Sequence, residues 1–540
     1  MALAIGAVVG SFADSSSHKA ARSFTQAWAR GDYAVMHDLL TDDAQSRYPL
    51  KAFRAAYRRA AATATLKRVA PEDPESTTDG EAVVPVLLNT RVFGRVRGRL
   101  TLPVDDDRID WTPNLAFPNV RRGERLRRRS DPPTRATIVS RDGKVLAQGP
   151  ADARSSPLGE LAGSIAGTLS PAESKAARLA LYEQGFPRNW PVGQTGLEKA
   201  FEDRLAGSPG GELLAGSRVL ARSRPRRAHR VRTTIDTRVQ EAAVTALAGR
   251  LGGVAALDAH TGEMRALAGI AFSAPQPPGS TFKIVTTTAA LEAHKVKPST
   301  EFPVQTAALI DGVELQNAGG ESCGGTFQNS FAHSCNSVFA PLGVRVGAKR
   351  LVEAAERYGW NQPPTVPGEA PSTLPPADEI VTPLEVGSTA IGQGKVLATP
   401  LVMASVAQTI AEEGVRTKPT LVPDARAERE RVTSRRVANT IERLMVDVVK
   451  YGTGTAAAIE GVPVAGKTGT AELEDTRVTP GSDAPPPPQD GSNTDAWFTA
   501  YAPADRPRIA VAVMLVRAGA GGATAAPAAR LVLDAGLKAR

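Results

Sequence analysis

Three short motifs follow one another along this chain of 540 residues, and together they could catalyse acyl transfer. The first offers a hydroxyl nucleophile, Ser280, and an amine three residues later, Lys283, which would lie on the same face of a helix. The second, Ser334-Cys335-Asn336, adds another hydroxyl and an amide. The third, Lys467-Thr468-Gly469-Thr470, adds a cation beside two hydroxyls that suit a substrate carboxylate. The set predicts a serine acyl transferase.

Ser280 is expected to begin a helix over residues 280–292, because Gly279 and two prolines precede it. The helix dipole there favours negative charge on the Ser280 oxygen, and the Ser280 backbone N–H is free to face an oxyanion. A serine needs a base before it can act as a nucleophile. Lys283 can be that base only when neutral, so burial or a nearby cation must lower its pKa. Lys467 is the candidate cation.

The second motif is expected in a loop, because helical patterns over residues 327–333 and 337–343 flank it. In that position Ser334 could relay a proton to a leaving group, and Asn336 could orient Lys283 and a substrate amide. Taken alone, the first and the second motif each also fit an ordinary helix cap. The prediction therefore depends on the three motifs occurring together and in order.

Two other pattern matches compete with this interpretation. A second Ser-x-x-Lys stands at residues 16–19 without companion motifs. Residues 461–468 match the phosphate-loop pattern G-x-x-x-x-G-K-T, which requires a strand before the loop and a helix opening at the lysine. Residues 456–459 favour helix rather than strand, and Pro463 with its neighbouring valines favours an extended chain through Lys467. We therefore interpret residues 467–470 as a strand and exclude a nucleotide site.

Composition limits the other classes of function. The chain has 65 basic and 56 acidic residues and a net charge of +9. This excess is compatible with an anionic partner but does not by itself indicate that the protein binds nucleic acid. The histidines do not cluster at metal-ligand spacing, so we expect no metal and no cofactor. Two cysteines, Cys323 and Cys335, exclude a zinc cluster and a disulfide framework. Outside a cell they could pair and brace the second motif, and the sequence leaves that pairing open.

The first half of the chain is predicted to hold three segments. Residues 1–14 are an apolar remnant of an anchor or signal, shorter than the about 20 residues of a membrane span. Residues 15–112 show two helical patterns and then strands over residues 82–88, 90–96 and 99–104, which predict a small α+β domain. Residues 113–231 hold a hairpin signal between two arginine-dense stretches, which favour a solvated linker or strand edge over contact with an anionic lipid or wall polymer.

Residues 232–540 are predicted to form the largest domain. Helical patterns mix with short apolar strands over residues 254–257, 264–267, 495–501 and 509–516, which predict an antiparallel sheet flanked by helices. Residues 479–492 contain four consecutive prolines, which cannot form a strand and predict a mobile loop.

In this order the three motifs resemble those of the penicillin-binding transpeptidases of bacterial cell-wall synthesis, which share the serine β-lactamase fold. The likeness covers residues 232–540 and extends to residues 234–240, 253–267, 392–404, 452–456 and 496–503. Upstream, residues 193–211 resemble the pedestal of class B members, and residues 15–110 resemble a nuclear-transport-factor-2-like (NTF2-like) domain. The resemblance therefore implies a multidomain α+β protein: an NTF2-like domain (15–112), a pedestal or dimerisation-type domain (113–231) and a penicillin-binding transpeptidase domain (232–540).

The resemblance also implies a role for each motif residue. Ser280 would be acylated by the penultimate D-Ala of a stem peptide, Lys283 would deprotonate it, Ser334 would return the proton, and Asn336 would orient Lys283 and the peptide. The third motif would hold the terminal carboxylate through Lys467, Thr468 and Thr470, and Gly469 lies between the two threonines. The backbone N–H groups of Ser280 and Thr470 would form the oxyanion hole, and β-lactams would trap Ser280.

Further expectations follow from the same resemblance. No glycosyltransferase-like segment precedes the motifs, so we expect a monofunctional D,D-transpeptidase acting in cell shape or division. It would be anchored by its N-terminus at the outer face of the bacterial plasma membrane, with a glycosyltransferase of the wall machinery as a partner. Cys335 stands where the β-lactamase signature has Asp, and Ala136 stands where the pedestal would have Gly. A D,D-carboxypeptidase, a β-lactamase and a non-catalytic wall scaffold or sensor remain the alternatives.

Overall fold

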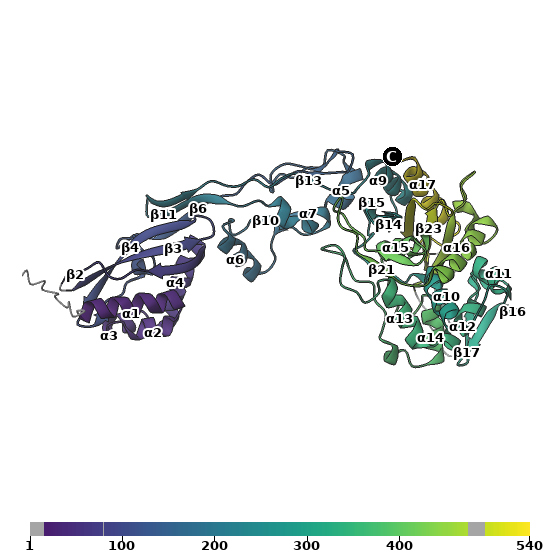
Figure 1. Cartoon of the computed structure of the whole chain (residues 1–540), viewed down its shortest axis with the longest axis horizontal. Helices are drawn as coiled ribbons and strands as arrows, with labels where there is room; N and C mark the ends of the chain where they lie inside the picture. Colours follow the sequence, from purple (N-terminus) through teal and green to yellow (C-terminus); the bar gives the residue numbers. More distant parts are fainter. Residues whose placement is uncertain (1–15, 79, 474–491, 540) are drawn as a thin grey trace, which may run out of the picture.

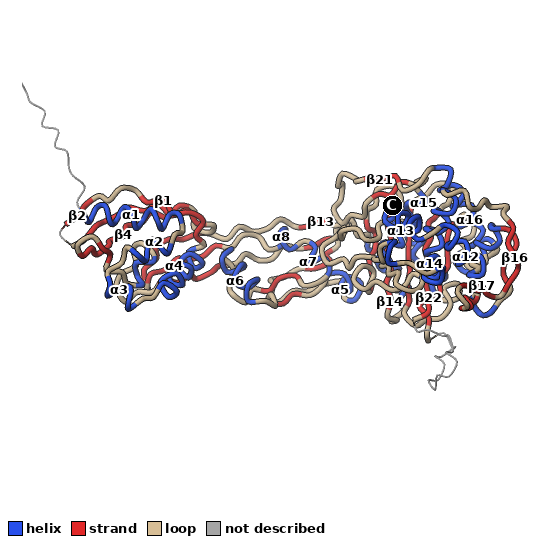
Figure 2. The backbone as a smooth tube through the Cα atoms, turned by 90° about the horizontal axis from the view of Figure 1, so that it is seen from below, coloured by secondary structure: helices blue, strands red, loops and turns tan. Residues whose placement is uncertain are grey.

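The computed structural model describes residues 16–78, 80–473 and 492–539. The apolar residues 1–14 and nearly all of the proline-rich stretch 479–492 lie outside them. A smaller N-terminal body and a larger C-terminal body lie at opposite ends of a long, narrow arm (Figures 1 and 2). Among the described residues, no helix is long and apolar enough to span a bilayer.

The N-terminal body packs helices against a curved antiparallel sheet. Its helices are α1 (Ser16–Arg30), α2 (Tyr33–Asp38), α3 (Asp42–Arg47) and α4 (Leu50–Ala64). Its strands are β1 (Leu66–Pro71), β2 (Ser76–Thr78), β3 (Glu81–Thr90), β4 (Arg95–Asp105) and β5 (Arg108–Ile109), followed by the 3-10 turn η1 (Pro113–Ala116). The sheet runs β1-β3-β4-β5, with β2 pairing β3. Trp111, Tyr57 and Phe53 fill its core, so this body encloses an apolar centre of its own.

One strand predicted in this body is wrong. Residues 91–94 form the turn between β3 and β4 instead of the middle of a strand over 90–96. The Thr90 hydroxyl accepts a hydrogen bond from the Phe93 N–H and donates one to the Gly94 carbonyl. Gly94 has φ +65°, a conformation that glycine adopts without steric cost. This turn chemistry outweighs the β propensity of the apolar residues beside it.

The arm consists of narrow ribbons of mostly antiparallel strands, with one parallel pair between β7 and β13 and short helices beside them. A three-stranded sheet in the order β12-β11-β6 lies against the N-terminal body. The arm's elements are β6 (Leu126–Asp131), β7 (Ile138–Val139), β8 (Val145–Ala147), α5 (Glu160–Ala166), β9 (Leu169–Pro171), α6 (Lys175–Gln184), β10 (Pro191–Gly193), α7 (Gly196–Ala200), α8 (Glu202–Leu205), β11 (Gly210–Ala215), β12 (Arg218–Ser223) and β13 (Val231–Arg232). A buried ion cluster, in which Arg135 and Arg154 both pair with Glu198, fixes α7 to the ribbon.

The C-terminal body is built on one five-stranded sheet in the order β15-β14-β24-β23-β22, with every pair antiparallel. The strands are β14 (Gly252–Asp258), β15 (Met264–Gly269), β22 (Ala465–Glu472), β23 (Thr494–Ala502) and β24 (Ile509–Leu515). Every residue of β24 is buried, because helices cover both faces of the sheet. This arrangement confirms the predicted antiparallel sheet flanked by helices.

The helices divide between the two faces of the sheet. The terminal helices α9 (Thr237–Leu247) and α17 (Ala525–Lys538) cover one face (Figure 1). The other face carries α10 (Lys283–Glu292), α11 (Phe327–Ala332), α12 (Asn336–Val346), α13 (Ala348–Tyr358), α14 (Pro383–Ala390), α15 (Pro400–Ala411) and α16 (Arg435–Lys450). Short connecting elements are η2 (Gly279–Phe282), β16 (Glu301–Gln305), β17 (Ala307–Ile310), β18 (Val313–Gln316), η3 (Ala318–Gly320), β19 (Cys323–Thr326), η4 (Ala377–Glu379), β20 (Val415–Thr417), β21 (Arg429–Arg431) and η5 (Thr455–Ala457). The three motifs meet beside the edge strand β22.

Candidate active site

Ser280 lies in the 3-10 turn η2, and α10 begins at Lys283, three residues later than the helix expected from the sequence. Gly279 shapes this turn. It has φ +51°, and its N–H donates to the Gly392 carbonyl at 2.9 Å. A Cβ on Gly279 would lie 2.7 Å from the Thr470 carbonyl oxygen. The turn therefore presses against β22, and only glycine permits both the backbone angle and the close approach.

Lys283 is fully buried behind the turn. Its Nζ donates to the Ser334 carbonyl at 2.7 Å, to the Ser334 hydroxyl at 3.2 Å and to Asn336 Oδ1 at 2.7 Å. Burial, followed by the charge of Lys467, holds the pKa of Lys283 well below its ordinary value. A lowered pKa favours the neutral amine, which is the form that can accept a proton. Its bonds go to the second motif, and the Ser280 hydroxyl is not among its partners in this state.

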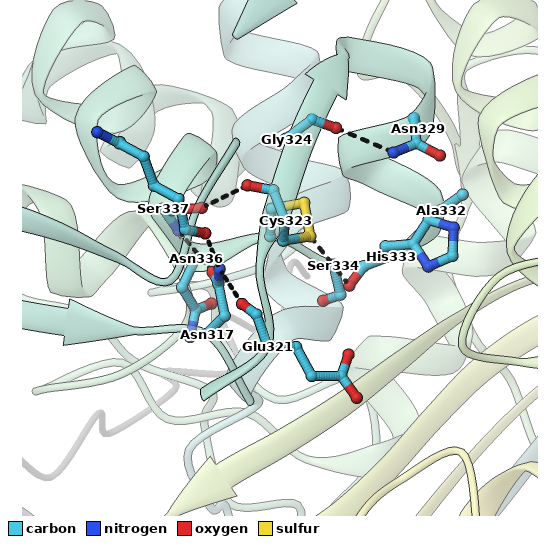
Figure 3. The surroundings of a disulfide bond; sticks show 12 residues. Asn317, Glu321, Cys323, Gly324, Asn329, Ala332, His333, Ser334, Asn336 and Ser337 are labelled. Atoms are coloured by element: carbon cyan, nitrogen blue, oxygen red, sulfur yellow. Dashed lines mark hydrogen bonds between the residues drawn. A yellow bond between two sulfur atoms is a disulfide. The ribbon is translucent and has the colours of Figure 1, made fainter. Parts of the chain in front are cut away.

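Ser334 lies in the short connection between α11 and α12, with φ +60°. That conformation is uncommon for a residue with a Cβ and is found where surrounding contacts hold it. Here the neighbouring Cys335 forms a disulfide with Cys323 at the start of β19, with a Cα–Cα distance of 5.4 Å (Figure 3). The Ser337 hydroxyl also donates to the Cys323 carbonyl at 3.2 Å. These contacts tie the Ser334 turn to a strand outside the helical layer.

Asn336 begins α12 and uses both ends of its amide. Oδ1 accepts from Lys283, while Nδ2 donates to the Gln316 carbonyl at the end of β18 at 2.7 Å. The adjacent Asn317 accepts from the Ser337 N–H at 2.9 Å and donates to the Glu321 carbonyl, as Figure 3 shows. The hairpin β17–β18 therefore fixes the amide that holds Lys283.

Lys467 of β22 is fully buried and reaches across to the second motif. Its Nζ donates to the Ser334 hydroxyl at 2.8 Å and to the Thr468 carbonyl at 3.0 Å. Burial lowers the pKa of Lys467 to about 7. Near neutral pH its charge is therefore easily gained or lost. Phe331 lies under this amine and Phe339 under that of Lys283, which keeps both nitrogens among apolar rings.

The backbone of β22 presents N–H groups to the turn that holds Ser280. In an antiparallel ladder, alternate residues direct their N–H groups toward the neighbouring strand and away from it. The Leu473 N–H donates to Asn493, in line with the register that pairs Thr470 with Ala496. Thr470, three residues before Leu473, therefore directs its N–H away from β23, toward the edge that the Ser280 turn faces.

The two threonine hydroxyls of β22 already have partners. Thr468 is buried, and its hydroxyl lies 2.5 Å from that of Thr453. The Thr470 hydroxyl accepts from the Gly521 N–H at 3.3 Å. A substrate carboxylate would have to share or displace these bonds, whereas the Lys467 amine lies directly beside the Ser334 hydroxyl.

Sequence reasoning did not assign a role to three of the contacts. Thr453 bonds Thr468 and also donates its N–H to the Ala332 carbonyl, which joins β22 to α11. Gly392 receives the Gly279 N–H, and Gln316 receives Asn336. Thr453 and Gly392 lie in stretches whose sequence is similar to the family, but spacing alone gave no partner. Among the described residues, no group of His, Cys, Asp and Glu could hold a metal ion.

Comparisons with known proteins agree with this architecture. The penicillin-binding protein transpeptidase domain model matches residues 252–534, and the penicillin-binding protein dimerisation domain model matches residues 149–218. The peptidoglycan D,D-transpeptidase PbpA of Mycolicibacterium smegmatis is 34% identical over 416 residues, 64% of this chain and 80% of that protein. PbpA of Mycobacterium tuberculosis is 37% identical over 302 residues, 50% of this chain and 56% of that protein.

Solved structures are similar over three quarters of the chain. The D,D-transpeptidase domain of a peptidoglycan glycosyltransferase from Eggerthella lenta is 30% identical, with a TM-score of 0.59, and the match covers 75% of this chain and 98% of that one. Penicillin-binding protein A from M. tuberculosis, in its penicillin G acyl-enzyme complex, is 29% identical, with a TM-score of 0.57 and coverage of 75% and 100%. This chain belongs to the penicillin-binding protein transpeptidase family. The match to the dimerisation domain identifies it as a class B member.

Proposed function

We propose that this protein is a peptidoglycan D,D-transpeptidase, a serine acyl transferase that cross-links stem peptides. One observation carries the proposal: a fully buried amine, Lys283, whose pKa is lowered, lies between the Ser334 hydroxyl and the Asn336 amide, one turn after Ser280. A neutral amine at that place is the base that a serine nucleophile requires. The names of its relatives supply the substrate class.

The proposed reaction begins with attack of the Ser280 oxygen on the penultimate D-Ala carbonyl of a donor stem peptide. Lys283 takes the hydroxyl proton, and the backbone N–H groups of Ser280 and Thr470 stabilise the oxyanion. Collapse breaks the peptide bond, and Ser334 delivers a proton to the departing D-Ala amine, supported by its contacts with Lys283 and Lys467. The amine of a second stem peptide then attacks the ester, which forms the cross-link and frees Ser280.

The third motif would recognise the donor's terminal carboxylate. Protonated Lys467 supplies the charge, and the Thr470 and Thr468 hydroxyls beside Gly469 supply hydrogen bonds after rearranging their present partners. A β-lactam presents the same carboxylate and a strained amide, so it would acylate Ser280 and remain there. The structures of M. tuberculosis penicillin-binding protein A as β-lactam acyl-enzymes support this step.

We also propose identities for the other segments of the chain. Residues 15–112 would be an NTF2-like domain, since four helices cover one curved sheet. Residues 113–231 would be the pedestal that holds the transpeptidase domain, residues 232–540, away from the N-terminus. With residues 1–14 belonging to a membrane anchor, the site would face the wall outside the plasma membrane, where a glycosyltransferase supplies new strands.

Peptide substrates test the proposal directly. Purified protein is incubated with a D-Ala-D-Ala stem peptide and a second peptide that bears a free amine. Mass spectrometry should detect a cross-linked dimer and one released D-Ala. Ser280→Ala should abolish both products. Trimmed donor without dimer would assign a D,D-carboxypeptidase, and rapid hydrolysis of penicillin would assign a β-lactamase. Unchanged function of Ser280→Ala in cells would assign a wall scaffold or sensor.

A further inference from the structure

The arm carries two arginine-rich segments that the proposed reaction does not use. Residues 121–129 contain six arginines and one glutamate, and residues 222–232 contain six arginines and no acid. About 100 residues of chain separate them, yet they lie on one ribbon, because β6 and β12 are the two edges of the sheet β12-β11-β6. Beyond β12, the second segment continues as an extended chain to β13 (Figure 1).

Some of these arginines have structural roles. Arg128 points to the inner face of the sheet, donates to the carbonyls of Ala62 and Tyr182, and stacks on the Tyr182 ring. Outside both segments, Arg218 at the start of β12 pairs with Glu124, the one glutamate of the first segment. Arg129 and Arg222 share a single carboxylate, that of Glu212 on the central strand. These pairs neutralise only a small part of the charge on the ribbon.

The other arginines of both segments are exposed and have no carboxylate partner within the described part of the chain. They are Arg121, Arg122, Arg125, Arg127, Arg224, Arg226, Arg227, Arg230 and Arg232. Arg127 and Arg232 donate to backbone carbonyls, and among residues 16–78, 80–473 and 492–539 no hydrogen bond holds the other guanidinium groups in place. A surface that keeps this many like charges close together raises its own free energy unless an anion is bound.

Strand alternation gathers the charges on one face. Arg129 and Arg222 both pair in register with Glu212, so the three side chains lie on the same face of the sheet, and Arg127 and Arg224 follow two residues along. The opposite face packs Leu213 and Ala215 into the core of the N-terminal body. On the charged face, residues 129–131, 211–212 and 222–224 line a depression of about 530 Å³.

We propose that this arginine ribbon, formed by residues 121–129 and 222–232, binds a linear polyanion with phosphodiester charges. Three strands about 5 Å apart make a surface only about 10 Å wide, while an extended segment of residues 222–232 spans up to about 36 Å. The charges therefore follow a line, which matches a polymer with regularly spaced phosphates. Arginine suits phosphate oxygens because its planar fork can donate two parallel hydrogen bonds.

The composition of the ribbon distinguishes this ligand from two others. Neither segment contains an aromatic residue. Surfaces that lie on a lipid bilayer usually insert aromatic or leucine side chains among the basic ones, and Leu126, the single leucine of both segments, is partly buried against the N-terminal core. Single-stranded nucleic acid is usually bound by stacking its bases on aromatic rings. A polymer with phosphates and no bases needs only the guanidinium groups.

Binding of poly(glycerol phosphate) to the full chain tests the proposal. The variant Arg224→Gln/Arg226→Gln/Arg227→Gln/Arg230→Gln removes four charges whose side chains support no other part of the fold. We expect fluorescence anisotropy with a labelled polymer to show a loss of affinity of about tenfold or more. The slope of log affinity against log salt should fall by about 3, since each phosphate that a guanidinium neutralises adds about 0.7 to that slope.

A matched control removes four exposed arginines of the N-terminal body, Arg58→Gln/Arg59→Gln/Arg91→Gln/Arg95→Gln. It should keep wild-type affinity, and both variants should react with penicillin at the wild-type rate if Ser280 is its target, which leaves the test independent of the catalytic proposal. Equal losses in both variants, or no loss in the ribbon variant, would overturn the proposal. So would tight binding to phosphatidylglycerol vesicles through the same arginines without binding to the polymer.

Discussion

Lys467 Nζ lies 2.8 Å from the Ser334 hydroxyl oxygen, which Lys283 Nζ also reaches at 3.2 Å. Ser334 and Lys467 are 133 positions apart in the sequence, so the fold brings distant segments together at this oxygen. Burial lowers the pKa of both lysines, that of Lys467 to about 7. Ser334 therefore stands between two amines whose pKa values are both lowered, and a hydroxyl bonded to two such amines is suited to a proton relay.

The pH dependence of acylation should report the charge of Lys467. Carboxylate binding requires protonated Lys467, so the second-order rate of penicillin acylation should fall as pH rises through about 7. Lys467→Arg keeps its charge throughout this range. Its rate should be about tenfold lower, since the longer guanidinium must fit a fully buried place, but without the decline at high pH. The same decline in both proteins would show that another group titrates.

Asn336→Asp should move the low-pH limb of the same profile. A carboxylate beside Lys283 favours the ammonium form and raises the pKa of Lys283, by about 1–3 units for a close pair. Less neutral base is then present at pH 7, so acylation should fall about tenfold or more, and this loss relative to the wild type at the same pH should recover as pH rises. Asn336→Ala removes the hydrogen bond without adding charge, so its loss should not recover in this way. Equal pH profiles for the two variants would contradict the contact.

Gly279→Ala tests the close approach of the Ser280 turn to β22. A methyl group there would lie 2.7 Å from the Thr470 carbonyl oxygen, so the turn must move. A displacement of about 1 Å at a reacting group can cost 10²-fold in rate, which is the loss of acylation that we expect. Gly249→Ala is the matched control, because Gly249 also has positive φ, +75°, but meets no atom within 4 Å. Similar acylation rates in both variants would refute the argument.

Removal of the disulfide should lower stability. The bond closes a loop between residues 12 positions apart, and the entropy of that closure is worth about 3 kcal/mol. The double variant Cys323→Ser/Cys335→Ser should therefore unfold at a lower denaturant concentration than the wild type. A reductant should shift the wild type to the same midpoint and leave the variant unchanged, since the chain has no other cysteine. A wild-type midpoint that ignores the reductant would contradict the bond.

Local patterns predicted most of the elements around the site. The apolar face of α16 repeats with the period of a helix, whereas β14, β15, β23 and β24 are short apolar runs, and a short window of sequence reveals both kinds of pattern. The sequence predicts a helix from Ser280, three residues before α10 begins, because a 3-10 turn and an α-helix share their first sequence signals at Gly279. The strand predicted over residues 90–96 fails because the apolar residues beside the turn favour a strand by propensity. The hydrogen bonds of Thr90 with Phe93 and Gly94 form a turn there instead.

The contacts between distant segments had no such signal. Strand β14 pairs with β24 across more than 200 residues, and the Asn336 amide depends on a backbone carbonyl at Gln316. A carbonyl carries no side-chain identity, so no residue type could indicate it. The partner of Thr468 is a threonine, Thr453, and any threonine would fit the same role on composition alone. Only the assembled fold selects among them.

The central claim is that Ser280 is the nucleophile and Lys283 its neutral base. Intact-mass spectrometry with penicillin, followed over time and with peptide mapping, tests both at once. We predict one stable adduct on Ser280 in the wild type, and a rate of formation about 10²–10⁴-fold lower in Lys283→Met. No adduct, an adduct on a different residue, or an unchanged rate in Lys283→Met would contradict the account.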